Sequence, residues 1–202
     1  MKLYTDATTP YGRKVRVVIH ELGLADKVEE QVTDPYNPPP EFLAANPLSK
    51  IPTLVTEHGE ALPDSRLIVE YLLTRGRGLA PLGRGSKRWA MLRRVQVAEG
   101  LIDAAVATVV EKRRPESIVY HTFLDRQAAA IRRCVDMLNL EVNALSLEQI
   151  GLAEITAGVA LSYLELRLPY LEWRALHEPL SAWHTQFAQR PSMLATAPPP
   201  GS

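Results

Sequence analysis

The chain of 202 residues is long enough for one large domain or two small ones with a well-buried core. Lys plus Arg and Asp plus Glu each number 23, so the formal net charge is zero and gives no reason to expect nucleic acid or a membrane surface as a partner. Cys134 is the only cysteine, which excludes an internal disulfide and a cysteine-based metal cluster. The N-terminus lacks the apolar segment of a secretory signal, and no apolar run approaches membrane-spanning length, so we expect a soluble, cytoplasmic protein.

The first 75 residues alternate between strand and helix patterns. In chain order we expect a strand at 2–5, a helix from 10 that ends at Gly23, a strand at 28–33, a short helix at 40–45, a hairpin from 51–56 and 60–62, and a helix at 63–74. This order, βαβ-ββα, predicts an α/β domain.

Residues 75–88 are rich in glycine and arginine and predict a linker. Beyond them, apolar residues recur at steps of three or four, which predicts helices only. The segment 153–166 is apolar almost all round and is expected to be a central buried helix. A last helix with Leu180, Trp183 and Phe187 is expected to stop before Pro191.

The segment "TDATTP" (5–10) places two threonines directly before a proline. Thr9 at the N-cap and Pro10 at the first helical position are common helix-start residues, so capping alone explains one threonine. The same helix start exposes free N–H groups and the positive end of the helix dipole, which favour an anion. A threonine hydroxyl there could donate a hydrogen bond to a ligand's thiolate and lower the pKa of that thiol. Both interpretations stay open, as does the choice between Thr8 and Thr9.

Two further motifs suit a peptide-like ligand. Pro52 is either an ordinary proline at a strand start or follows a cis bond that turns the backbone of Ile51 outward to pair with an extended ligand. Asp64 and Ser65 open a predicted helix and are good capping residues. In the functional alternative, Asp64 binds an ammonium group, and Ser65 with the helix N-terminus binds a carboxylate, as an α-amino acid group would require.

Taken together and in this order, these features make the chain resemble a glutathione S-transferase of the bacterial type over nearly its whole length. The segments that carry the resemblance are "TTPYGRKVRV", "NPLSKIPTL", "DSRLIVEYL", "GLAEITAGVALSYLELRLP" and "QRPSMLATAPP". The resemblance implies a thioredoxin-like, glutathione-binding domain with a mixed four-stranded sheet at 1–75, a linker at 76–86, and an all-α helical bundle with the second-substrate pocket at 87–202. It also implies a homodimer that uses glutathione as co-substrate.

The family's roles carry over to this chain by position. Lys50 would lie near the glycine carboxylate of glutathione. The family pattern implies that Pro52 is cis and that Ile51 pairs with the cysteinyl backbone. Asp64 and Ser65 match the acidic-Ser pair that holds the γ-glutamyl end.

Thr9 replaces the Ser or Cys that the family places before the proline, and is our candidate catalytic residue. Tyr11 either lines the thiol site or packs against its neighbours. Because neither Thr9 nor Gly12 is a cysteine, the reactive sulfur must come from the ligand. Cys134 is expected to be a small core residue. The five histidines form no i, i+3 or i, i+4 pair, so we infer no metal site.

The expected function is transfer of glutathione to a small hydrophobic electrophile, with no nucleic acid and no membrane as partner. Threonine in place of Ser or Cys motivates two alternatives. One is a non-catalytic glutathione-binding or interaction protein of the same fold, and the other is a glutathione-dependent peroxidase or dehalogenase.

Overall fold

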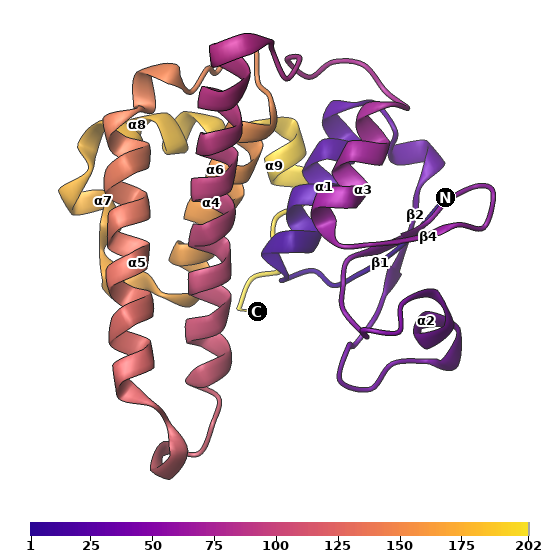
Figure 1. The fold of residues 1–202 in the computed structure, drawn as a ribbon, viewed down its shortest axis with the longest axis horizontal. Helices are drawn as coiled ribbons and strands as arrows, with labels where there is room; N and C mark the ends of the chain where they lie inside the picture. The colour runs from indigo at the N-terminus through magenta and orange to yellow at the C-terminus, as the bar shows by residue number, and fades with distance from the viewer. Residues whose placement is uncertain (202) are drawn as a thin grey trace. The chain divides into compact units, whose positions relative to one another are not determined.

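The computed structural model describes residues 1–201, which divide into two compact units (Figure 1). The first unit contains Met1–Leu79 and also the segment that begins at Arg190, while the second contains Ala80–Gln189. None of the helices in the described residues is both long and apolar enough to cross a membrane.

The division predicted for function, with a domain at 1–75, a linker at 76–86 and a domain at 87–202, stays a proposal. It differs in two places from the compact units. Helix α4 (Gly85–Glu111) already begins within the range predicted as linker. The last residues of the chain belong to the first unit by their contacts.

The first unit is built on a mixed four-stranded sheet, as expected from the family resemblance. Its strands are β1 (Lys2–Thr5), β2 (Glu29–Val32), β3 (Thr53–Val55) and β4 (Ala61–Pro63). Their order across the sheet is β2-β1-β3-β4, with β1 parallel to β2 and the other two pairs antiparallel. The helices that accompany them are α1 (Pro10–Glu21), the 3-10 turn η1 (Ala25–Lys27), α2 (Pro40–Ala45) and α3 (Ser65–Leu73). The predicted order βαβ-ββα is therefore confirmed.

Local sequence explains why α1 begins and ends where it does. Pro10 has no N–H to leave unpaired at the first helical position. At the other end Gly23 has φ of 65°, and its N–H donates to the carbonyl of His20. The N–H of Leu24 reaches back to the carbonyl of Ile19, which completes the double closure typical of a glycine-terminated helix. The helix packs against α3 and buries its apolar face.

A further helix, α9 (Pro191–Ala195), follows the one that we expected to be last. The expectation was wrong because Pro191, read as a stop signal, occupies the first turn of a new helix, where proline is equally favoured. α9 packs on α1. Glu21 accepts hydrogen bonds from Arg190 at 3.0 Å and from Ser192 at 2.5 Å. Arg13 donates to the carbonyl of Met193 at 3.1 Å, and burial, with the nearby charge of Arg16, lowers its pKa to about 10.

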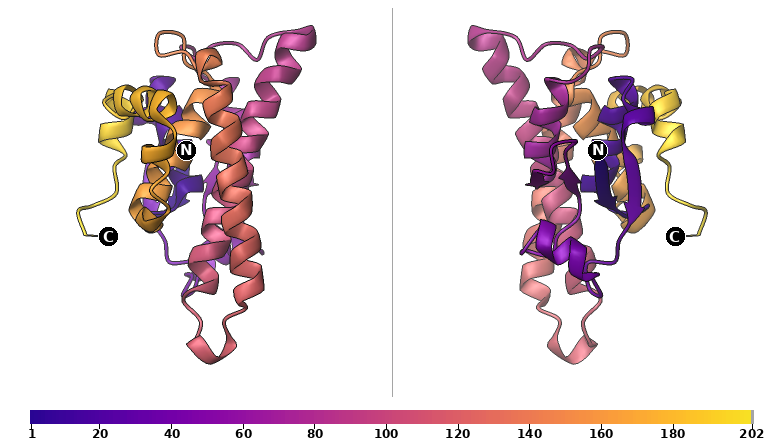
Figure 2. Two further views of the ribbon diagram at one scale, coloured as in Figure 1. Left: turned by 90° about the vertical axis from the view of Figure 1, so that its left-hand side faces the viewer. Right: turned by 90° about the vertical axis from the view of Figure 1, so that its right-hand side faces the viewer.

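The second unit is entirely helical, as predicted. After α4 come η2 (Glu116–Ile118), α5 (His121–Leu140), η3 (Val142–Ala144), α6 (Leu152–Arg167), η4 (Pro169–Leu171), α7 (Trp173–Leu176) and α8 (Glu178–Phe187). Helices α4 and α5 run side by side in opposite directions, as all views in Figures 1 and 2 show. α6 packs against α4 and is buried on nearly every face, which confirms the prediction of a central buried helix.

Two features show how α6 is held. Its N-cap is Gly151, which has no side chain to accept the free N–H groups of the first turn. The buried carboxylate of Glu154 accepts the N–H of Gly151 at 2.8 Å and that of Ser146 at 3.2 Å. In the middle of the helix, a Cβ on Gly158 would fall well inside contact distance of the Phe187 ring. Only glycine allows α6 and α8 to approach this closely.

Candidate functional site

The strand register brings three loops to one edge of the sheet. Tyr4 at the end of β1 pairs with Thr53 at the start of β3, and Thr53 pairs with Pro63 at the end of β4. The loop before α1, the loop before β3 and the start of α3 therefore leave the sheet at the same edge. Because neighbouring strands lie about 4.8 Å apart, β1 and β4 are about 10 Å apart there. All three predicted motifs belong to these three loops.

Thr9 is the N-cap of α1, as predicted, but its hydroxyl makes no capping hydrogen bond. The methyl of Thr9 lies beside Gly12, where an added Cβ would come within 2.6 Å of the Cγ2 atom. Glycine at that position therefore accommodates the methyl by which threonine differs from serine. Within residues 1–201 the hydroxyl of Thr9 has no hydrogen-bond partner.

Asp6 was missed by sequence reasoning, and it organises the loop before α1. Its Oδ1 atom accepts the N–H groups of Thr8 and Thr9, each at 2.6 Å, and the Thr8 hydroxyl at 3.2 Å. The hydroxyl of Thr8 is therefore already hydrogen-bonded to Asp6 within the loop, whereas that of Thr9 is not. An Asp side chain can accept the backbone N–H two residues on, so residue type allows a turn at Asp6. Nothing in the sequence shows that the same oxygen also accepts the N–H of Thr9 and the hydroxyl of Thr8.

The peptide bond between Ile51 and Pro52 is cis, as the family pattern implies. Asn46, also missed by sequence reasoning, is 1 % exposed and holds this loop. Its amide donates to the Lys50 carbonyl and to the Thr53 hydroxyl, both at 2.9 Å, and that hydroxyl also donates to the Lys50 carbonyl at 2.9 Å. The N–H and C=O of Ile51 have no hydrogen-bond partner in the described part of the chain. They are available to an extended ligand.

The start of α3 has a side-chain cap, Asp64, followed by Ser65, whose hydroxyl has no hydrogen-bond partner within residues 1–201. Asp64 is the N-cap and accepts the N–H of Arg66 at 2.7 Å. Its φ of 72° lies in the left-handed region, which is costly for a residue other than glycine and is often found at functional sites. Ser65 is 3 % exposed, and its hydroxyl has no partner among residues 1–201. A nearly buried hydroxyl without a partner at a helix N-terminus suits an anionic ligand group.

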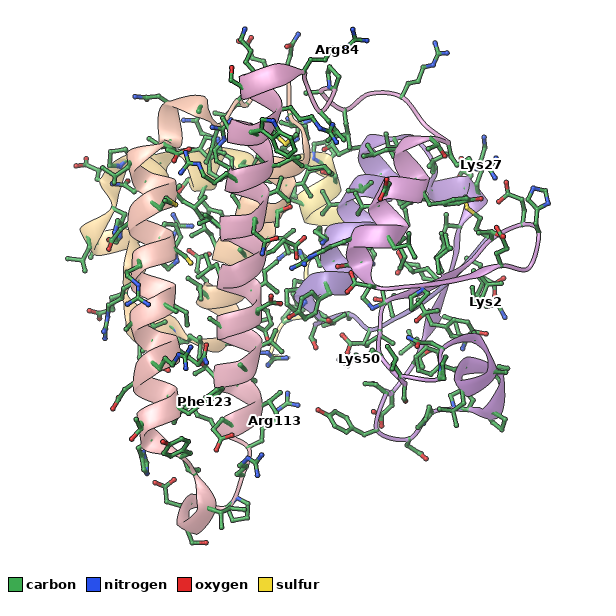
Figure 3. All side chains as sticks on the ribbon, viewed as in Figure 1. Lys2, Lys27, Lys50, Arg84, Arg113 and Phe123 are labelled. Atoms are coloured by element: carbon green, nitrogen blue, oxygen red, sulfur yellow. The ribbon has the colours of Figure 1, made fainter. Side chains whose placement is uncertain are left out.

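The two remaining predicted residues are Tyr11 and Lys50, which belong to the start of α1 and to the loop before β3. Tyr11 is half-buried in the first turn of α1. The side chain of Lys50 is exposed and labelled in Figure 3, on the loop before β3. No hydrogen bond or ion pair within the described residues fixes its ammonium group.

A serine–histidine pair elsewhere in the chain is not a nucleophile and base. Ser162 lies 2.9 Å from Nε2 of His184, in the helical unit. Nδ1 of the same ring lies 2.6 Å from the guanidinium of Arg174, which can only donate. Nδ1 must therefore accept, the proton sits on Nε2, and the ring cannot take a proton from Ser162.

Cys134 and the histidines supply no alternative chemistry. Cys134 is half-buried, not a fully buried core residue, and burial raises the pKa of its thiol, which opposes a reactive thiolate. In the part of the chain that the structure describes, no three His, Cys, Asp or Glu side chains come close enough together to hold a metal ion.

Comparisons with known proteins agree with this fold. A family model described as "Glutathione S-transferase, N-terminal domain" matches residues 8–75. The chain is 31 % identical over 202 residues to the uncharacterized GST-like protein YibF of Escherichia coli, covering 98 % of this chain and 99 % of that protein.

Solved structures extend the likeness to both units. A glutathione transferase family member from Pseudomonas fluorescens Pf-5, crystallised with bound glutathione, has a TM-score of 0.91 and 39 % identity over 98 % of each chain. A glutathione S-transferase from Methylobacillus flagellatus KT with glutathione bound has a TM-score of 0.88 and 35 % identity, covering 98 % of this chain and 99 % of that chain. The chain therefore belongs to the glutathione S-transferase family, with a thioredoxin-like N-terminal domain and helices beyond it.

Proposed function

We propose that this protein is a glutathione transferase, which binds reduced glutathione, holds its sulfur as the thiolate and adds that sulfur to a small hydrophobic electrophile. The observation that carries the proposal is the single sheet edge that gathers Thr9, Ile51 and Ser65, each with an uncommitted hydrogen-bonding group. Family membership and the glutathione bound to two similar proteins support it.

The dimensions of the edge suit a tripeptide. Three extended residues span at most about 10–11 Å, close to the distance of about 10 Å between β1 and β4. In the proposed arrangement, Asp64 and Ser65 hold the γ-glutamyl ammonium and carboxylate, and Ile51 pairs with the cysteinyl backbone. Lys50 then faces the glycine carboxylate. The cysteinyl sulfur falls near the start of α1.

Thr9 is proposed to stabilise the thiolate by one hydrogen bond from its hydroxyl. The hydroxyl of Thr8 is a poorer candidate because Asp6 already accepts its proton. The start of α1 adds the partial positive charge of the helix dipole. Tyr11, in the first turn of the same helix, is proposed to line the thiol site.

A non-catalytic glutathione-binding protein is the second candidate, and one observation favours it. The Asp6 carboxylate accepts two N–H groups at the helix start and places a negative charge near the proposed thiolate. Such a charge opposes ionisation of a bound thiol. Binding of glutathione without turnover of any electrophile, halide or peroxide would favour this candidate, and turnover of halides or peroxides alone would favour a dehalogenase or peroxidase.

Calorimetric titration with reduced glutathione tests the binding step, and a panel of electrophiles then tests transfer. We expect saturable binding that Ser65→Ala weakens about tenfold or more, because a hydrogen bond to a charged carboxylate is lost. Ser117→Ala, at an exposed serine of the helical unit, is the matched control and should bind as the original chain does. Absence of measurable binding, or equal weakening by both variants, would refute the proposal.

Three further expectations belong to this proposal. The helical unit supplies the pocket for the electrophile, the protein is a homodimer, and it works in the cytoplasm, where glutathione is kept reduced. Gel filtration with light scattering tests the dimer.

A further inference from the structure

A cavity of about 360 Å³ lies wholly within the helical unit, among α4, α5 and the turn η4. Its volume falls in the range of small-molecule sites. It lies towards the end where α4 finishes and α5 begins, marked in Figure 3 by the labelled Arg113 and Phe123. No residue of the proposed glutathione site contributes to its lining.

Most charged groups around this cavity have few or no hydrogen bonds or ion pairs within the described residues. Arg132 and Asp125 have no hydrogen bond or ion pair within residues 1–201. Among the described residues, the ammonium of Lys112 donates only to the hydroxyl of Tyr170, at 2.8 Å, and it lies 4.0 Å from the centre of the Tyr170 ring. His121 faces Glu116 at 3.5 Å. Two cations and one carboxylate therefore border the cavity besides the histidine.

The unused hydrogen-bonding capacity consists largely of donors. The ammonium of Lys112 keeps two N–H groups beyond the one given to Tyr170, and the tyrosine hydroxyl that accepts it keeps its own proton. The guanidinium of Arg132 presents a planar pair of N–H groups that matches a carboxylate or sulfonate. An organic anion fits this donor set, and Asp125 disfavours a second negative charge beside it.

One side of the cavity is lined by apolar side chains of α5. Leu124, Ala128 and Ile131 are spaced four and then three residues apart, so they form one face of α5. Arg132 follows one turn after Ala128 on the same side. From Leu124 to Arg132 the helix rises about 12 Å, which is enough for two fused aromatic rings and an acid group.

We propose that this cavity is a second ligand site, for an aromatic organic acid with a single negative charge. The rings would lie on Leu124, Ala128 and Ile131. The acid group would be held by Arg132 and by the Lys112–Tyr170 pair. The site needs no glutathione, so it stands or falls separately from the proposed transferase.

The test is calorimetric titration of the full chain, without glutathione, with naphthoate and with its neutral analogue naphthamide. We expect one saturable site at which naphthamide binds about tenfold more weakly, because it lacks the charge. Arg132→Gln should weaken naphthoate about tenfold. The matched control is Arg133→Gln, one position further along α5 and outside the lining, which should leave the affinity unchanged. Ala128→Phe should fill the cavity and abolish binding.

Each contrary result overturns the proposal. Equal affinity for naphthamide would show that the negative charge of naphthoate does not contribute to binding. Equal loss of naphthoate affinity in Arg133→Gln would show a general attraction to the arginines of α5. Naphthoate that binds normally to Ala128→Phe must sit elsewhere. If Ala128→Phe does not fold, as judged by circular dichroism, the comparison of Arg132→Gln with Arg133→Gln still tests the proposal, since both arginines are exposed.

Discussion

Replacing Thr9 by valine removes the hydroxyl and keeps the branched shape. The methyl that lies beside Gly12 is retained, so the start of α1 should keep its structure. Thr9→Ser makes the complementary change, because it keeps the hydroxyl and removes the methyl. Thr8→Val is the positional control, since the hydroxyl of Thr8 is bound to Asp6 instead.

The expected magnitude follows from one hydrogen bond to a charge, about 1.5–3 kcal/mol. In the proposed site the hydroxyl stabilises the thiolate and not the thiol, so we expect it to lower the pKa of bound glutathione. At about 1.4 kcal/mol per pKa unit, Thr9→Val should raise that pKa by about 1–2 units. Where the thiolate is the reacting form, kcat/KM below the pKa should fall by a factor of about 10–150.

The assay is titration of the thiolate's ultraviolet absorbance in the glutathione complex of each variant, followed by kcat/KM at each pH. Thr9→Ser should titrate close to the original protein, and Thr8→Val should do so as well. The reasoning is refuted if Thr9→Val titrates as the original protein does, or if Thr8→Val shifts the pKa by the same amount.

Three predictions concern stability. Burial alone would raise the pKa of Glu21, but hydrogen bonds and the charge of Arg190 outweigh it and lower that pKa. The stability that this pair adds is complete above the ordinary pKa of 4.5 and is lost as the pH falls through the lower pKa of the folded state. The free energy of unfolding, measured with urea, should therefore fall more steeply on acidification in the original chain than in Glu21→Gln. Glu154→Ala should cost about 2–3 kcal/mol by urea unfolding, because two N–H groups lose their acceptor. Gly158→Ala should lower the melting temperature through overpacking, whereas Gly100→Ala in α4, with open space around it, should stabilise by up to about 1 kcal/mol.

Each of these has a result that would contradict it. Parallel pH profiles for the original chain and Glu21→Gln would show that the carboxylate contributes nothing on acidification. An unchanged midpoint in Glu154→Ala would mean that water replaces the carboxylate at the start of α6. Stabilisation by Gly158→Ala would mean that α8 moves away without cost.

Local patterns predicted most of the elements, because the signals that start and stop them are local. The strand at Lys2–Thr5 and the helix at Pro40–Ala45 have the bounds that the sequence indicated. α9 escaped prediction because proline both ends one helix and begins another, and only the neighbouring α1 decides between them.

The candidate site also has features that the sequence predicted and features that it did not. The helix starts at Thr9 and at Asp64–Ser65 could be read from residue type and spacing. The roles of Asp6 and Asn46 could not, since each depends on which atoms the folded loop brings within hydrogen-bond distance.

Local residue patterns were enough to predict the family and the order of the elements, and both are confirmed. They also led to the prediction that the reactive sulfur of the proposed transferase belongs to its ligand, because neither Thr9 nor Gly12 is a cysteine. Which threonine hydroxyl lacks a hydrogen-bond partner among the described residues follows from the fold and not from residue type. Thr8 and Thr9 are the same residue type, but in the folded loop the hydroxyl of Thr8 donates to Asp6, whereas that of Thr9 makes no capping hydrogen bond. Likewise the pairing of β1, β3 and β4 gathers three distant loops at one edge, since register is a property of the sheet and not of any single strand.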